Sequence, residues 1–269
     1  MKSKILHPDD MIGLIPAAGK ASRLGLIPLS KELYPIGFEE KEGVRFPKTV
    51  SSYLLDQMAE AGISSYHIVL KNGKWDIPAY FKGGADFNLN FCYHIADFAY
   101  GVPFSINQAY PYVKEKMVAF GFPDILIKSG EVFKKLAEKL STNSETSVVL
   151  GLFPSPDPLK WDMVELNKDK NVTNIFIKTE KGKHLKYTWV VAVWKPQFTG
   201  FLNDYIKKLL ANNTHEELLA NEYQLSDIFL SAISNGIKIE NVIFKDGKCM
   251  DIGTPERLSR AETFLEMLT

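Results

Sequence analysis

Short apolar runs alternate along the first part of the chain with segments whose apolar residues recur at helical spacing, and this alternation most constrains the fold. The runs predict buried strands at residues 11–15, 66–70, 89–94, 117–120 and 147–153. The segments between them predict helices at residues 49–61, 75–81, 104–113 and 131–140. Strands that alternate with helices in this way predict an α/β layer sandwich with a mostly parallel sheet.

The pattern changes after Pro154. Strand-like segments joined by short charged turns predict a small antiparallel insertion at residues 163–166, 172–178 and 187–194. Helices at 198–210 and 225–235, a strand at 237–244 and a last helix that begins at Thr254-Pro255 complete the prediction. Because no repeat or long linker divides the 269 residues, we expect one domain over residues 1–269.

Charge and cysteine content limit the partners of the protein. Lys plus Arg and Asp plus Glu both number 32, so no net field attracts nucleic acid or a membrane surface. No apolar run approaches the ~20 residues of a membrane span, and no signal peptide is recognisable. Cys92 and Cys249 form neither a disulfide framework nor a zinc pattern. We expect no nucleic-acid or membrane partner and a cytoplasmic location.

A loop rich in small residues follows the first predicted strand and precedes Arg23 and Lys31. Small residues let the backbone approach a ligand closely, while Arg and Lys side chains can contact phosphate oxygens. The loop is neither a Walker A motif nor a GxGxxG fingerprint. It predicts a site for a nucleoside triphosphate, and its candidate nucleotide-binding residues are Ala17, Ala18, Gly19, Lys20, Ala21 and Ser22.

The same stretch resembles the signature of the nucleotidyltransferases that make NDP-sugars from sugar 1-phosphates. In that family a small-residue loop ends in Gly-Thr/Ser-Arg-Leu, and Pro-Lys-Glu/Pro and an apolar-Pro-apolar segment follow. The matching residues here are Ser22-Arg23-Leu24, Lys31-Glu32 and Tyr34-Pro35-Ile36. The chain thus resembles the sugar-phosphate nucleotidyltransferases, which include thymidylyl- and uridylyltransferases of glucose 1-phosphate.

Further matches follow in the same order to the end of the chain. Gly101 falls where the family has a glycine near the nucleoside, Asp124 at its Gly-Asp aspartate and Lys178 at the lysine of Glu-Lys-Pro. Residues 223–227 resemble its Gln-Leu-Thr-Asp segment, and residues 250–255 its Asp-Ile-Gly-Thr-Pro segment. The resemblance implies a Rossmann-like central sheet of the nucleotide-diphospho-sugar transferase type.

The implied activity is magnesium-dependent transfer of a nucleotidyl group from an NTP to a sugar 1-phosphate, or a related phosphorylated small molecule, with release of pyrophosphate. Arg23 and Lys31 are then the catalytic residues, and Asp124 and Asp251 bind Mg²⁺. Residues 1–153 form a nucleotide-binding half and residues 154–269 an acceptor-binding half. The family commonly forms oligomers, so a homo-oligomer is also consistent with the resemblance.

The acceptor side departs from the family pattern. Asp162 and Val191 stand where the family has glycines against the hexose, and Ala96 stands near its base-reading Gln. The predicted acceptor-binding set consists of four residues: Asp162, Lys178, Val191 and Asp227. Ala21 also replaces a loop glycine. These differences favour an unusual acceptor and leave two alternatives: a cytidylyltransferase of a non-hexose phosphate, or a non-catalytic relative that binds nucleotide or sugar phosphate.

Each site residue also has a purely structural interpretation. Asp124 could be a turn residue or helix cap, Asp251 an Asx turn, Asp227 a helix cap and Lys178 a solvated strand residue. The tryptophans at 161, 189 and 194 are typical of core or of a sugar-site wall. The five histidines are scattered without ligand spacing, and the sequence assigns them no role.

Overall fold

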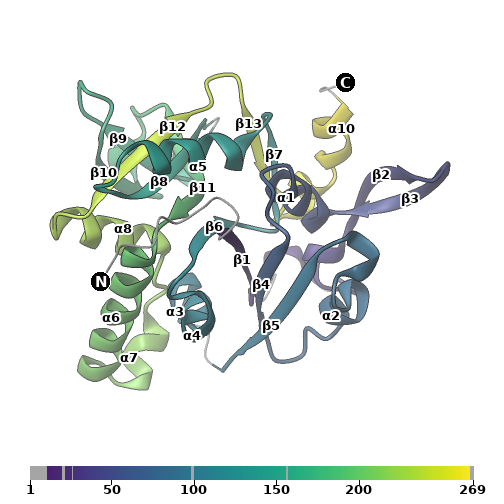
Figure 1. Ribbon diagram of the computed structural model, residues 1–269, viewed down its shortest axis with the longest axis horizontal. Coiled ribbons are helices and arrows are strands. Elements are labelled where there is room, and N and C mark those ends of the chain that lie inside the picture. The colour runs from purple at the N-terminus through teal and green to yellow at the C-terminus, as the bar shows by residue number, and fades with distance from the viewer. Residues whose placement is uncertain (1–10, 20–21, 26, 98–99, 156, 267–269) are drawn as a thin grey trace.

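The computed structural model of the chain describes residues 11–19, 22–25, 27–97, 100–155 and 157–266. One mixed sheet extends through both halves of the chain (Figure 1). Its strands are β1 (Met11–Ala17), β4 (Ser65–Lys71), β5 (Asn90–Ala96), β6 (Met117–Gly121), β8 (Thr146–Pro154), β9 (Asp162–Leu166), β10 (Val172–Ile177), β11 (Tyr187–Trp194) and β12 (Lys238–Ile243).

The strand order is β10-β9-β11-β6-β1-β4-β5, with β8 paired to β11 and β12 paired to β8. Strands β6, β1, β4 and β5 are parallel to one another, and β12 is parallel to β8. Strand β11 runs antiparallel to β6, β8 and β9, while β10 runs antiparallel to β9. The predicted α/β fold is confirmed, with the antiparallel strands after residue 154 continuous with the central sheet.

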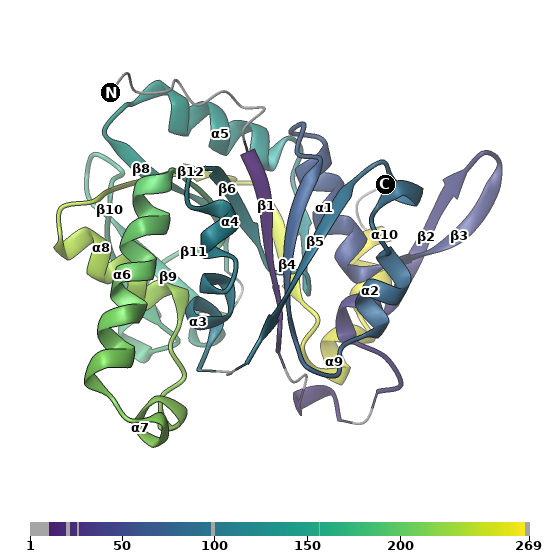
Figure 2. The same cartoon turned by 60° about the horizontal axis from the view of Figure 1, so that its bottom comes forward.

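Helices cover both faces of this sheet, which gives three layers (Figure 2). Within the described ranges no helix has the length and apolarity that crossing a membrane requires. The helices are α1 (Val50–Ala59), α2 (Asp76–Phe81), α3 (Val102–Asn107), α4 (Tyr110–Val113), α5 (Val132–Thr142), α6 (Pro196–Asn212), α7 (His215–Ala220), α8 (Leu225–Ser234), α9 (Pro255–Leu258) and α10 (Ala261–Glu266).

Strand β1 is buried on both faces because its apolar side chains alternate between two cores. Ile12 and Leu14 pack in a cluster that includes side chains of α3, α6 and α8. Met11 and Ile15 pack on the opposite face, with side chains of α1, α2 and α5. The alternation follows from the two-residue period of a strand, and it explains why the strand appears in the sequence as a continuous apolar run.

Two small antiparallel sheets were not predicted. Strands β2 (Pro35–Lys41) and β3 (Val44–Thr49) form a hairpin that projects from the body of the protein (Figure 1). Phe38, Val44 and Phe46 are largely exposed on it, so no buried face gives these strands a periodic signal. Strands β7 (Ile125–Lys128) and β13 (Lys248–Asp251) pair with each other, although more than a hundred residues separate them.

Two predicted helices are each divided in two. The helix expected at 104–113 consists of α3 and α4, and Pro111 lies in the first turn of α4. Proline has no N–H to donate to the preceding helical turn, so a continuous helix is not formed there. The helix expected from Thr254 consists of α9 and α10, and the Thr254 side chain accepts a hydrogen bond from the Arg257 N–H, as its predicted capping role requires.

Gly13 in β1 provides a test of the packing between β1 and β4. A Cβ at this position would lie 2.4 Å from the ring of Tyr66, which is fully buried. Gly13→Ala is expected to lower the free energy of unfolding by about 1–3 kcal/mol, as overpacking of a core does. Gly130→Ala is the matched control, because its Cβ meets no atom within 4 Å. Urea denaturation measures both, and equal stability of the two variants would contradict the packing argument.

Candidate active site

A cavity of about 1170 Å³ lies beyond the carboxyl ends of β1 and β6. Residues of both halves line it, and open α/β sheets bind ligands at this edge. The cavity brings together most of the residues predicted from the sequence: Ala18, Gly19, Arg23, Lys31, Gly101, Asp124, Asp162, Lys178 and Asp251. These residues are up to 233 positions apart in the chain, from Ala18 to Asp251, so the fold assembles the site.

The small-residue loop forms one wall of the cavity. Ala18 and Gly19 line it, whereas Ala17 packs into the core beneath. The side chain of Arg23 lies against Gly253, since a Cβ on that glycine would be 2.9 Å from the Arg23 Nη2 atom. Lys20 and Ala21 lie outside the described residues, as does the side chain of Ser22, whose backbone begins a short 3₁₀ helix.

Lys31 forms an ion pair with Asp124 in the cavity wall. The Lys31 Nζ atom donates to the Asp124 Oδ2 atom, and 13% of each side chain remains exposed. Burial alone would lower the pKa of Lys31, but the negative charges of Asp124, Glu32 and Asp251 outweigh it and raise the pKa. Lys31 is therefore a fixed positive charge at neutral pH, suited to an anionic ligand and unsuited to the role of a base.

The β7–β13 pairing brings the two predicted metal ligands to one wall. Asp251 is paired with Ile125, and the Ile252 N–H donates to the Asp124 carbonyl at 3.0 Å. The carboxylate of Asp251 accepts from the Gly253 N–H at 2.6 Å and from the Arg257 Nη1 atom at 2.8 Å. Asp251 thus forms the Asx-type turn that its sequence suggested and also lines the cavity.

On the opposite side, a buried hydrogen-bond chain ends at Asp162. The Trp189 Nε1 atom donates to the Ser226 hydroxyl at 2.8 Å, which donates to the Asp162 Oδ2 atom at 2.5 Å. The other carboxylate oxygen, Oδ1, is buried and accepts no hydrogen bond from the described residues. Burial raises the pKa of Asp162, partly offset by the Ser226 hydrogen bond and by the charge of Lys178.

Lys178 and Gly101 line the cavity in unusual backbone conformations. Lys178 is exposed and has a φ of 44°, which L-residues rarely adopt outside functional or tightly constrained positions. Gly101 has a φ of 115°, and a Cβ there would lie 2.0 Å from the Tyr223 carbonyl oxygen. The Tyr223 N–H in turn donates to the Tyr100 carbonyl at 3.2 Å, so this glycine permits direct contact between the two halves.

Two residues of the predicted acceptor-binding set lie outside the cavity lining. Val191 is fully buried in the core on the α5 side of the sheet, because a β-bulge between Trp189 and Val191 places their side chains on opposite faces. Asp227 accepts a hydrogen bond from the Gln224 N–H at 2.8 Å and caps α8, as its structural interpretation suggested. We therefore correct the contact role predicted for both residues.

For the three tryptophans, the sequence left open whether they lie in the core or in the wall of a sugar site, and both occur. Trp161 and Trp189 line the cavity, whereas Trp194 is buried in the core. Ala96, near the position of the family's base-reading Gln, is buried at the end of β5 and is not part of the cavity lining.

Several charged residues of the cavity were missed. Lys160, Arg257 and Arg260 add positive charge to its wall. Glu32 is 1% exposed, and both its carboxylate oxygens accept from the Lys74 Nζ atom, at 2.7 and 2.8 Å. Burial raises the pKa of Glu32 despite the attraction of Lys74. Glu32 could have been predicted, because it is adjacent to Lys31 in the sequence. Lys74 could not, because it lies 42 positions after Glu32, between β4 and α2, and no sequence motif marks it.

Comparison with known proteins identifies the family. The family model described as Nucleotidyl transferase matches residues 12–267. The chain belongs to the nucleotidyl transferase family. The matched range covers nearly the whole fold described above, including both walls of the cavity. No curated protein sequence matches this nucleotidyl transferase significantly.

Many solved structures share the fold of this nucleotidyl transferase, including the following two. One is a Bacillus anthracis protein described as a glucose-1-phosphate thymidylyltransferase, in complex with a sucrose. It is 19% identical, with a TM-score of 0.79 and 96% of each chain covered. The other is a UDP-glucose pyrophosphorylase from Acinetobacter baumannii, 17% identical, with a TM-score of 0.72 and coverage of 94% of this chain and 92% of that one. At this identity the likeness concerns the fold.

The Glu32–Lys74 pair supports the segment that carries Lys31, and its contribution can be measured. Lys74→Met leaves a buried carboxylate without its partner and is expected to lower the free energy of unfolding by about 3–5 kcal/mol. The double variant Glu32→Gln with Lys74→Met removes both charges and should recover most of that loss. Urea denaturation of the two variants tests this, and additive losses in the double variant would contradict a buried ion pair.

Proposed function

We propose that this nucleotidyl transferase couples a nucleoside triphosphate to a sugar 1-phosphate, with release of pyrophosphate. The main support is that Arg23, Lys31 and the carboxylates of Asp124 and Asp251 meet in one cavity. Phosphoryl-group chemistry requires positive charge and alignment rather than an acid–base pair, and this wall offers both. The names of the two structural neighbours, which concern glucose 1-phosphate and UDP-glucose, favour a sugar phosphate as acceptor.

In the proposed reaction, a phosphate oxygen of the acceptor attacks the α-phosphorus of the NTP. The bond between the α-phosphorus and the bridging oxygen breaks, and pyrophosphate leaves with the electron pair. Arg23 can form a bidentate contact with the β- and γ-phosphates of the leaving group. Lys31 neutralises charge at the α-phosphate, since its raised pKa keeps it protonated. Lys178 is assigned to the phosphate of the acceptor.

We assign Mg²⁺ to Asp124 and Asp251, because the donor set fits that ion. Both groups are carboxylates, the hard oxygen ligands that Mg²⁺ prefers, and both line the cavity beside the cationic side chains that face phosphate. Mg²⁺ binds typically through one or two carboxylates, with phosphate oxygens completing its coordination. When bound, the ion supplies charge neutralisation of the triphosphate. The same carboxylates hold Lys31 and Arg257 in the positions described above.

Asp162 sets a chemical requirement on the molecule that binds at the proposed acceptor site. Its buried Oδ1 atom accepts no hydrogen bond from the described residues, and such an atom is costly unless a ligand or water donates to it. An acceptor with a hydroxyl or amino group toward this carboxylate satisfies it, whereas an apolar group at the same place does not. We therefore propose an acceptor with a hydrogen-bond donor at this position, held against Trp161 and Trp189.

A cytidylyltransferase acting on a non-hexose phosphate remains the second candidate, favoured by Ala96 and by the carboxylate at Asp162. The test is to incubate the protein with Mg²⁺, each of the four NTPs or dTTP, and a panel of sugar and alcohol phosphates, while release of pyrophosphate is measured. A sugar 1-phosphate is expected to give turnover. Turnover with CTP and an alcohol phosphate alone would favour the second candidate, and binding of NTP without any turnover would refute both.

Asp251→Asn is expected to lower kcat at least about 100-fold, since loss of a metal ligand exceeds the 10–100-fold effect of second-shell changes. Asp227→Asn is the matched control, because Asn also caps helices and Asp227 lies outside the cavity lining. Pyrophosphate release at saturating substrates measures both variants. Full activity of Asp251→Asn would show that the metal assignment is wrong.

Asp162→Ala is expected to raise the KM for the acceptor about tenfold while the KM for the NTP is unchanged, because it removes one buried hydrogen bond of about 1–3 kcal/mol on the acceptor side. Asp169→Ala, in the turn after β9, is the control for loss of an acidic group. Initial rates with each substrate varied in turn give both constants. An equal rise in the two KM values would point to a general structural effect and against acceptor recognition.

A further inference from the structure

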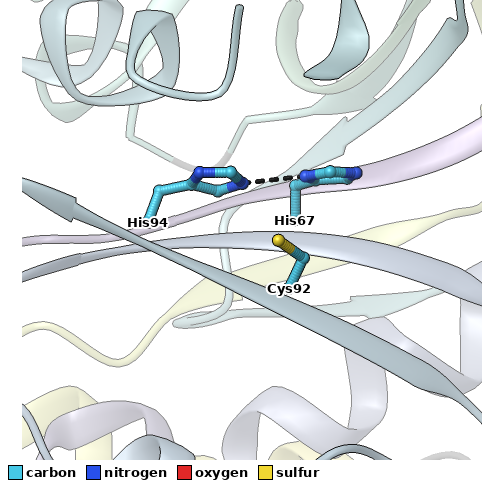
Figure 3. A group of neighbouring side chains, drawn as sticks. All are labelled: His67, Cys92 and His94. Atoms are coloured by element: carbon cyan, nitrogen blue, oxygen red, sulfur yellow. Dashed lines mark hydrogen bonds between the residues drawn. The ribbon is translucent and has the colours of Figure 1, made fainter. Parts of the chain in front are cut away.

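A cluster of two histidines and a cysteine lies on the sheet and is absent from the lining of the catalytic cavity. His67 is on β4, and Cys92 and His94 are on β5 (Figure 3). The strand register pairs His67 with Cys92, while Cys92 and His94 are two residues apart on one strand and so face the same side. One nitrogen or sulfur atom of each residue lies within 4.8 Å of the other two.

The two imidazoles already contact each other through the atoms that would bind a metal. The His67 Nδ1 atom lies 2.8 Å from the His94 Nε2 atom, so one of these nitrogens donates a hydrogen bond to the other, in a direction set by the tautomers. Around a tetrahedral Zn²⁺, two nitrogen ligands at about 2.0–2.1 Å are roughly 3.3 Å apart. The nitrogens therefore need to separate by only about 0.5 Å, with a turn of the rings, for a cation to take the place of the proton.

We propose that His67, Cys92 and His94 form a binding site for Zn²⁺. Imidazole nitrogen and thiolate sulfur are the donors that Zn²⁺ takes in proteins, and three protein ligands leave a fourth position for water. The set differs in kind from the paired carboxylates of the cavity, which suit a hard cation. The proposal is independent of the proposed function, because none of the three residues contributes to the cavity lining.

The place of the cluster in the fold gives the ion both access and a structural effect. Strand β5 lies at the end of the strand order, and Cys92 is exposed on it. His94 is buried and His67 is partly buried, with the ring of Tyr112 centred 5.1 Å from His94 and 6.2 Å from His67. The histidines are thus shielded from solvent while the thiol is open to it. A bound ion ties the edge strand β5 to β4 and stabilises the folded state by mass action.

Co²⁺ provides a direct test, because a cysteine thiolate bound to this ion gives a near-ultraviolet charge-transfer band. The protein is stripped of metal with a chelator, kept reduced and titrated with Co²⁺. The expected results are a thiolate band that saturates at one ion per chain and its loss on addition of Zn²⁺. Excess Mg²⁺ is expected to leave the band in place, which separates this site from the carboxylates of the cavity.

Matched variants identify the ligands. Cys92→Ser is expected to abolish the band, and His67→Gln and His94→Gln to weaken Zn²⁺ binding at least tenfold in calorimetric titrations. Cys249→Ser, which changes the buried cysteine, and His184→Gln are expected to leave binding unchanged. Circular dichroism checks that each variant is folded. Absence of a thiolate band in the wild-type protein at saturating Co²⁺, or equal affinity in Cys92→Ser and Cys249→Ser, would overturn the proposal.

Discussion

The candidate active site depends on the pairing of two four-residue strands, β7 and β13. This pairing places β13 beside the segment that follows β6, so that Asp251 and Asp124 line the same cavity. Backbone hydrogen bonds, which are independent of side-chain identity, fix the register and so bring the backbone of Asp251 beside that of Asp124. Around them, Lys31 and Arg257 are placed by ion pairs to those same carboxylates. Charge complementarity thus organises the wall before any substrate is present.

The two sides of the cavity are built on different physical principles. The wall near β1 and β13 consists of partly buried charges in contact with one another, which suits an anion that can replace one partner of each pair. The opposite side is a buried hydrogen-bond chain from Trp189 through Ser226 to Asp162, in which one oxygen still lacks a donor. A charged wall recognises a triphosphate through its net charge, whereas a buried polar atom discriminates between ligands that differ by one functional group.

The sequence predicted the central strands and most of the cavity because both depend on local signals: apolar runs, and a motif read along the chain. The sequence did not predict the location of residues whose position depends on pairing between distant strands. Neither β7 nor β13 has a periodic signal of its own, and the bulge that turns Val191 away from Trp189 has no sequence marker. The spacing of His67 and His94 likewise indicated no site, since only the register of β4 and β5 brings their rings together.

The order of the elements along the chain has a consequence for synthesis. The loop and Lys31 leave the ribosome early, whereas β13, Asp251 and Arg257 are synthesised more than two hundred residues later, from residue 248 onward. The nine strands of the central sheet all precede this segment. A chain terminated before residue 248 therefore retains every strand of that sheet yet lacks one carboxylate of the acidic pair. The cavity wall is therefore complete only after residues 248–260 have been synthesised and β13 has paired with β7.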